Sequence, residues 1–261
     1  MRNSIQHLSL KISVLSLSLL FLAFPAQSQE SSASLIEEII VTSQRTEESL
    51  QDVPIAVTAL TSSMLEDMQI EGGSDLQLVT PSLSFQGSDA TGGAFNIRGI
   101  TNLAVSPTAE SGVEIHVNDL PVGATTMQDG DFLDMERIEV LRGPQGTLFG
   151  KNSVGGVINL ITAKPQFVEA FGSATVDVGS YDLFKTKLML NIPLGESLAM
   201  RIAASSNDRD GDIKNIYSKA KTSHVNNRDS DAYRLSIAWN ASDRTDVLFV
   251  HENYSENSMR H

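Results

Sequence analysis

The chain has 261 residues, a formal net charge of −13, a pI of about 4.7 and no cysteine. The acidic balance argues against a nucleic-acid partner, because binding phosphates requires a basic surface. The lack of cysteine excludes disulfides, thiolate metal sites and cysteine nucleophiles. A hydrophobic content of 41% suits a soluble protein or a membrane β-barrel and is too low for a bundle of membrane helices.

Residues 1–28 are predicted to be a secretory signal peptide. Arg2 and Lys11 supply positive charge, and an apolar run extends from Ile12 to Phe24 before the small residues that end at Ser28. The alternative is a membrane anchor, but this run is shorter than the roughly 20 residues that a spanning helix needs. We therefore expect the mature chain to lie outside the cytoplasm.

Residues 29–48 are expected to be a flexible segment that carries one β-prone run. The run Ile36 to Thr42 is rich in β-branched residues and includes two carboxylates. It has no obvious partner strand, and such a segment can add to the exposed edge of another protein's sheet. The alternative is an ordinary first strand of the domain that follows.

Residues 49–165 are expected to form one compact domain of short, mixed elements. Strands are predicted at Pro54–Leu60, Leu83–Gln86 and Val113–Val117, and helices at the capping boxes Ser63–Glu66 and Ser74–Gln77.

The strand Val113–Val117 alternates apolar residues with Glu114 and His116, which predicts one covered and one polar face. Asn118–Asp119 is predicted to turn the chain after it. A short helical turn is expected at Phe132–Met135.

A glycine-rich loop lies between two further predicted strands, Arg137–Leu141 and Gly156–Thr162. The second strand is apolar at both parities and is expected to be buried on both faces. The pair Gly150–Lys151 suggests a phosphate-binding loop, but the spacing from Gly146 is one residue short and Asn152 stands where that loop needs a hydroxyl. On composition alone, the loop is a connector between two core strands.

The stretch Arg142 to Gly150, RGPQGTLFG, and its continuation GGVIN from Gly155 resemble the plug-domain signature of TonB-dependent outer-membrane receptors. The stretch Phe95–Ile100 also matches a plug motif. The resemblance implies an N-terminal α+β plug domain inside a barrel of about 22 strands. It singles out as motif residues Arg98, Gly99, Arg142, Gly143, Pro144, Gly146, Gly150, Asn152, Gly155 and Gly156.

The resemblance also gives roles to residues that the sequence alone leaves open. It implies that the β-prone run is the TonB box, which pairs with the periplasmic, energy-transducing protein TonB through Glu38, Ile39, Ile40, Val41 and Thr42. It further implies that Arg98, Arg137 and Arg142 pair with acidic residues of the plug or the barrel wall. The alternative for these arginines is a solvated surface.

Residues 166–261 change to long alternating strands, which predict the antiparallel strands of an incomplete transmembrane β-barrel. Leu188, Leu190 and Ile192 share one parity, for example, and Lys187 and Asn191 the other. Aromatic residues near strand ends suggest an interfacial girdle, namely Tyr181, Trp239 and Tyr254. A long polar loop is expected at residues 207–229. The alternative is a soluble antiparallel sheet.

About five strands are predicted here, which is fewer than the roughly eight of the smallest outer-membrane barrels. An open edge in lipid would leave backbone groups without partners. We therefore expect the chain to be the N-terminal part of a larger receptor.

No enzymatic motif, cofactor site or metal-ligand spacing is recognised, and the histidines are scattered. The resemblance implies TonB-dependent uptake of a scarce small ligand (an iron–siderophore complex, cobalamin or a glycan) across the bacterial outer membrane, in contact with its lipid. The alternatives are a plug fragment that binds TonB without transport and a secreted soluble β-protein.

Overall fold

The structure is a computed structural model that describes residues 39–42, 45–46, 48–88, 92–101, 111–122, 130–216 and 224–258. The predicted signal peptide and Glu38 lie outside the described residues. The elements are β1 (Ile40–Val41), β2 (Glu48–Ser49), β3 (Val57–Thr61), α2 (Ser62–Asp67), η2 (Gly73–Asp75), α3 (Leu76–Val79), β4 (Leu83–Ser88), β5 (Gly92–Ile97), β6 (Val113–Val117), β7 (Leu120–Pro121), β8 (Met135–Arg142), α4 (Gly146–Phe149), β9 (Gly156–Thr162), β10 (Phe171–Val178), β11 (Phe184–Pro193), β12 (Leu198–Arg209), β13 (Ile213–Lys214), β14 (His224–Val225), β15 (Arg228–Ser242) and β16 (Thr245–Glu256).

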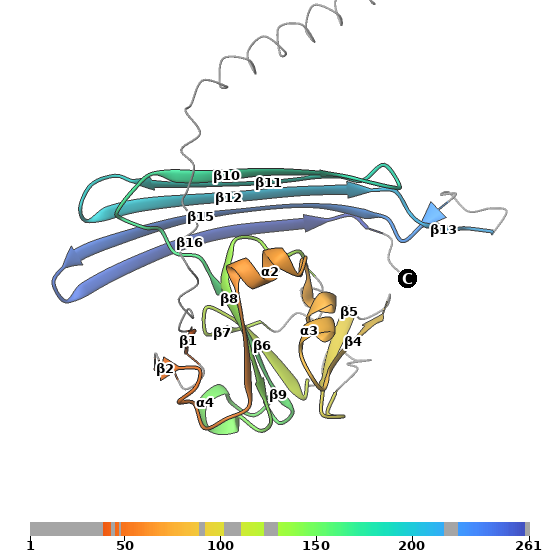
Figure 1. Cartoon of the computed structure of the whole chain (residues 1–261), viewed down its shortest axis with the longest axis horizontal. Coiled ribbons are helices and arrows are strands. Elements are labelled where there is room, and N and C mark those ends of the chain that lie inside the picture. Colours follow the sequence, from red (N-terminus) through yellow and green to blue (C-terminus); the bar gives the residue numbers. More distant parts are fainter. Residues whose placement is uncertain are drawn as a thin grey trace, which may run out of the picture. The chain divides into compact units, whose positions relative to one another are not determined.

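Five strands of the first region form one mixed sheet in the order β3-β8-β9-β6-β7 (Figure 1). β9 runs antiparallel to β8 and parallel to β6. The main apolar core covers one face of this sheet and joins strand side chains to those of the short helices: Leu60, Leu65, Leu76, Ile115, Ile138, Val140 and Ile158. This is the α+β domain that the sequence predicts.

The second face of the mixed sheet is also covered, and here one prediction is wrong. His116 of β6 is only 2% exposed, so the expected polar face of this strand is buried as well. Its ring packs edge-on against Phe149 at 5.1 Å between centroids. The predicted turn is confirmed, because Asn118 and Asp119 both have positive φ and join β6 to β7, as a two-residue hairpin requires.

The short helices form where expected, but their caps differ from the prediction. Thr61, not Ser63, caps α2 by accepting a hydrogen bond from the Met64 N–H. Asp75 accepts hydrogen bonds from two backbone N–H groups at the start of η2. The expected helical turn at residues 132–135 is absent, because Asp134 is a bend with φ 49° and Met135 already belongs to β8.

The core strand β9 begins and ends as predicted and is buried on both faces. Gly156 opens it at φ 156°, and a Cβ there would lie 2.3 Å from the Leu141 carbonyl oxygen of β8. Glycine is therefore required at this position because the two backbones approach too closely for any side chain.

The second region is a long antiparallel sheet in the order β10-β11-β12-β15-β16 (Figure 1). Its five strands form an open sheet among the described residues, with β10 and β16 at the edges. The register places one set of exposed apolar side chains on a single face: Val176, Val178, Phe184, Leu188, Leu190, Ile202, Tyr233, Trp239, Val247 and Phe249. The predicted period-two alternation is confirmed.

The opposite face of the long sheet carries basic side chains that contact acidic groups of the first region. Arg201 donates two hydrogen bonds to Asp134, at 2.6 and 2.7 Å. Arg228 and Ser230 bind the two carboxylate oxygens of Asp131. Lys185 and Lys187 both approach Glu71, and the Arg234 Nη1 donates to the Leu133 carbonyl oxygen at 2.6 Å.

Two expectations for the long sheet need correction. Tyr254 does not join an outward girdle, because it lies on the basic face and packs with Leu133, Ala203 and Ala232. The expected polar loop is shorter than predicted, since β12 continues to Arg209 and β15 already starts at Arg228. Within the described residues no helix combines the length and apolar character needed to cross a bilayer.

Gly156→Ala should destabilise the first region by about 2–4 kcal/mol, because its Cβ would displace the β8 backbone. Gly146→Ala is the matched control, since nothing lies within 4 Å of a Cβ there. Thermal unfolding followed by circular dichroism measures both changes. Equal midpoints for the two variants would contradict the close approach of β8 and β9.

Acid should loosen the contact between the first region and the long sheet. Burial alone would raise the pKa of Glu71, but Lys185 and Lys187 outweigh it and hold this pKa below the ordinary 4.5. Burial would also raise the pKa of Asp131, but Arg228 and Ser230 outweigh it and hold this pKa below the ordinary 3.8. Folding lowers both pKa values. The ion pairs therefore stabilise the contact fully when the pH is above the ordinary pKa values of 4.5 and 3.8, and this stabilisation is lost as the pH falls through the lowered pKa values of the folded protein.

Hydrogen exchange at residues 131–135, corrected for the intrinsic rate at each pH, measures this effect. Protection should be high at pH 6 and should fall below about pH 4. The double variant Glu71→Gln, Asp131→Asn should show little pH dependence in this window. Equal protection of the unaltered chain at pH 3 and pH 6 would count against these ion pairs.

Candidate functional site

The predicted partner-binding run is already paired within the chain, which corrects the expectation that it has no partner strand. Ile40 and Val41 of β1 lie opposite Ser49 and Glu48 of β2 in an antiparallel pair. We call β1 and β2 the N-terminal hairpin. Val41 is fully buried, whereas Ile40 is 42% exposed. The segment thus packs on the domain through Val41 and presents the neighbouring Ile40 to solvent.

Val41 anchors the hairpin to the second face of the mixed sheet. It packs with Val53 and with Ala59 of β3, and the partly buried side chains of Ile39 and Leu50 join the same cluster. This apolar contact fixes which face of β1 looks toward the domain.

The two edges of β1 differ in what they offer to a partner. The Leu50 N–H donates to the Ile39 carbonyl oxygen, and Val41 lies opposite Glu48. In an antiparallel ladder, alternate residues direct their main-chain groups to the same neighbouring strand. Ile39 and Val41 therefore face β2, and the main-chain groups of Ile40 and Thr42 point to the other edge.

That other edge is occupied at Thr42 by a buried carboxylate. The Thr42 N–H donates to the Glu139 Oε1 at 2.8 Å, and the Thr42 hydroxyl approaches the same oxygen at 3.3 Å. Glu139 lies in the middle of β8 and is fully buried. A side chain of the central sheet thus takes the place that a neighbouring strand's carbonyl would hold.

Arg137 completes this network from the same strand. Its Nε donates to the Glu139 Oε1 at 2.8 Å, and its Nη2 donates to the Thr42 hydroxyl at 3.2 Å. It also pairs with the exposed carboxylate of Glu136. The implied pairing of Arg137 with acidic residues is therefore confirmed, and both of them lie on its own strand β8.

Glu139 belongs to a polar row that crosses the buried sheet. The register places it beside Asn159 of β9, which in turn lies beside His116 of β6. Asn159 donates to the Asp119 Oδ1 at 3.2 Å, and His116 Nε2 lies 3.5 Å from the Glu114 carboxylate. Sequence reasoning did not single out Glu139, although a lone carboxylate inside the apolar run Ile138–Leu141 was a usable signal.

The glycine-rich loop, residues 143–155, folds against the start of the mixed sheet. Gly143 has φ 113°, and its N–H donates to the Gly155 carbonyl oxygen. The Gly155 N–H in turn donates to the Gly112 carbonyl oxygen. A Cβ on Gly143 would lie 3.2 Å from the Arg98 guanidinium. Gly143, Gly155 and Gly156 are buried, Asn152 is half-buried, and the exposed motif residues are Arg98, Gly99, Pro144, Gly146 and Gly150.

Arg98 and Arg142 do not reach an acidic partner within the part of the chain that the structure describes. Arg98 is exposed, and its backbone has φ 55°. Arg142 is half-buried, and its main-chain N–H donates to the Ala56 carbonyl oxygen. Their pairing with carboxylates stays a prediction.

The glycine-rich loop also contacts the N-terminal hairpin. Arg45, in the connection between β1 and β2, donates its Nε to the Leu148 carbonyl oxygen at 3.0 Å. Its guanidinium stacks 5.2 Å from the centroid of the Phe149 ring. The signature loop and Glu139 therefore hold the same hairpin from two sides.

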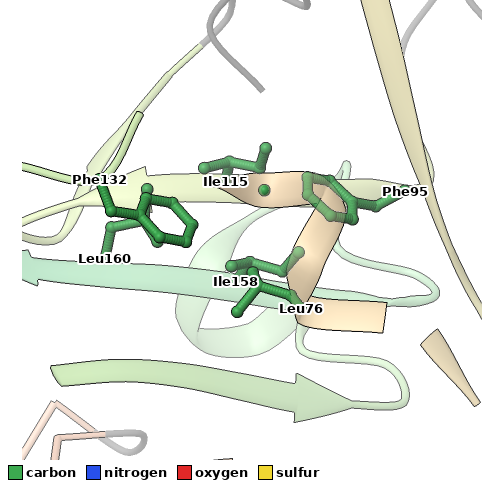
Figure 2. Close-up of a pocket in the computed structure, with 7 residues that line it drawn as sticks. Leu76, Phe95, Ile115, Phe132, Ile158 and Leu160 are labelled. Atoms are coloured by element: carbon green, nitrogen blue, oxygen red, sulfur yellow. The ribbon is translucent and has the colours of Figure 1, made fainter. Parts of the chain in front are cut away.

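A small pocket of about 10 Å³, partly open to solvent, lies in the main apolar core. Figure 2 shows its lining, which is apolar throughout: Gly73, Leu76, Phe95, Ile115, Phe132, Ile158 and Leu160. Such a lining offers no group for acid–base or nucleophilic chemistry. Among the described residues, no three histidine, aspartate or glutamate side chains come together as metal ligands.

The sequence matches the family model "TonB-dependent Receptor Plug Domain" over residues 49–157. The chain is 27% identical over 209 residues to the metal-pseudopaline receptor CntO of Pseudomonas aeruginosa, covering 78% of this chain and 26% of that protein. It is 26% identical over 207 residues to the vitamin B12 transporter BtuB of Photobacterium profundum, covering 77% and 33%. The chain thus spans about a quarter to a third of the length of these relatives.

Solved structures show the same fold. The ferric yersiniabactin uptake receptor FyuA from Yersinia pestis superposes with a TM-score of 0.67 at 23% identity, covering 77% of this chain and 31% of that one. The ferripyoverdine receptor of the Pseudomonas aeruginosa outer membrane gives 0.69 at 20% identity, covering 83% and 27%. The relatives are transport receptors rather than enzymes. With a region that matches the plug-domain model, followed among the described residues by five antiparallel strands, this chain is similar to the TonB-dependent receptors.

Proposed function

We propose that this chain serves TonB-dependent active transport of a scarce small ligand across the bacterial outer membrane. The observation that carries the proposal is a short β-strand before the plug, held among the described residues by the apolar packing of Val41 and Ile39 and by a few hydrogen bonds. A strand held in this way can be captured by another protein's sheet through main-chain hydrogen bonds.

The mechanism follows from how the pieces are attached. TonB pairs in the periplasm with the box at Glu38 to Thr42. Force applied there pulls on Thr42 and, through Glu139, on the central strand β8 of the plug. The plug then shifts or partly unfolds, which opens a path for the ligand. The energy comes from the inner-membrane proton gradient through TonB, so the chain needs no nucleotide of its own.

The ligand class is proposed from the relatives. Their names describe receptors for metal-pseudopaline, vitamin B12 and pyoverdine, so we propose an iron–siderophore or other metal–chelator complex first, with cobalamin and glycans next. We also propose that residues 1–28 are the export signal and that the apolar face of the long sheet contacts outer-membrane lipid. The domain division after residues 28, 48 and 165 is part of the same proposal.

The open long sheet favours a second candidate. Five strands do not surround a plug, because plugged barrels use about 22. This chain by itself would then bind TonB without moving a ligand. TonB-dependent uptake of iron–siderophore complexes or cobalamin by cells that produce the chain separates the two functions, since the fragment binds TonB and takes up nothing.

Ile40→Pro should abolish pairing with TonB and leave the plug folded. The Ile40 N–H points away from β2, so proline removes a donor only from the edge that a partner strand would use. Binding of the purified periplasmic domain of TonB should fall below detection, and any uptake should stop. Ile40→Ala is the control, because it keeps the N–H and should bind normally.

Circular dichroism of the Ile40→Pro chain checks the plug. Loss of plug folding would show that this run is a structural strand of the domain and would sink its assignment as the TonB box.

A further inference from the structure

We propose that Glu139 controls access to the TonB box by occupying the strand edge that TonB needs. This inference rests on the proposed function and adds a positioning residue to it. While the N-terminal hairpin contacts the plug, the Glu139 carboxylate accepts a hydrogen bond from the Thr42 N–H. A TonB strand must therefore displace this carboxylate before it can form main-chain hydrogen bonds with β1.

The first step of the argument is the direction of the edge. Val41 pairs with β2, so the main-chain groups of Ile40 and Thr42 lie on the opposite edge. That edge is where a third strand would add without breaking the hairpin. Of its two N–H groups, the one at Thr42 is held by Glu139.

The second step is the strength of the hold. Glu139 is fully buried and receives Arg137 Nε and Thr42 N–H on one oxygen, each at 2.8 Å. Hydrogen bonds to a charged acceptor are stronger than neutral ones, and burial strengthens them further. The other oxygen, Oε2, is buried and has no hydrogen-bond partner within the described chain. The carboxylate can therefore accept a further hydrogen bond at Oε2. Among the described residues, no donor at that oxygen draws the side chain away from Thr42.

The third step is that the hydrogen bonds with Glu139 and Arg137 are specific to Thr42, next to β1. Arg137 reaches the Thr42 hydroxyl as well as Glu139, so the three side chains form one closed set. Within the part of the chain that the structure describes, nothing comparable holds the exposed Ile40. Glu139 thus makes the box available only when the hairpin leaves β8, and the release can be measured separately from TonB binding.

Release is measured with a single thiol, because the natural chain has no cysteine. Val41→Cys places that thiol at a fully buried position of β1. Glu139→Gln keeps the side-chain size and removes the charge, so it should increase the thiol labelling rate about tenfold. Ile138→Cys, buried on the opposite face of the same β8, is the control and should label at an unchanged rate.

A second variant keeps the test decisive if Glu139→Gln unfolds the plug and exposes both thiols. Thr42→Val removes only the hydroxyl that binds Glu139 and Arg137, and it should increase Val41→Cys labelling about threefold. Thr46→Val makes the same change in the same hairpin, where the hydroxyl binds only the local Glu48, and should have no effect. Equal labelling of these two variants overturns the inference.

Binding to the purified periplasmic domain of TonB then separates this inference from the proposed function. A synthetic peptide of residues 36–46 carries the box without Glu139 and should bind more tightly than the unaltered chain. The chain with Glu139→Gln should approach the affinity of the peptide. If Thr42→Val is used in its place, it is compared with a peptide that carries the same substitution, because Thr42 belongs to the box. If the peptide binds and the variant chain binds no better than the unaltered one, the role of Glu139 is wrong. If the peptide itself does not bind, the assignment of the TonB box fails.

Discussion

A carboxylate buried in the middle of a sheet must be paired, and in this protein the pairing of Glu139 joins the N-terminal strand to the plug. Arg137 neutralises its charge from two residues away, and Thr42 supplies a main-chain donor from almost a hundred residues earlier. Breaking one side of a buried pair costs about 3–5 kcal/mol, because the remaining group is left uncompensated. The hairpin therefore docks in one register, although its apolar contact is a single valine with a few neighbours.

The glycine-rich signature takes part in the same arrangement. Its glycines let the chain turn at Gly143 and bring β9 against β8 at Gly156, where no side chain fits. The helix α4 that follows the turn presents a carbonyl oxygen and an aromatic ring to Arg45. The loop that looks like a connector in the sequence thus has two physical tasks, close packing of the central strands and attachment of the N-terminal segment.

Electrostatics also relates the plug to the long sheet. Acidic groups of the plug, Glu71, Asp131 and Asp134, face basic groups of β11, β12 and β15. Pairs of this kind fix orientation more than they add stability, because each charge loses solvation when it is buried. The long sheet therefore has two different faces, one apolar and exposed and one matched in charge to the plug.

The sequence by itself determined the resemblance to TonB-dependent receptors, the α+β character of the plug, the strand β9, the Asn118–Asp119 turn and the alternation of the long strands. These features depend on local patterns, in which glycine spacing and period two report directly on backbone geometry. Only the tertiary structure decided that β1 already has a partner, that His116 is buried, that Tyr254 faces the plug, and that Glu139 meets Thr42. Each of these depends on which distant segment covers a given face, and neither propensity nor spacing along the chain encodes that choice.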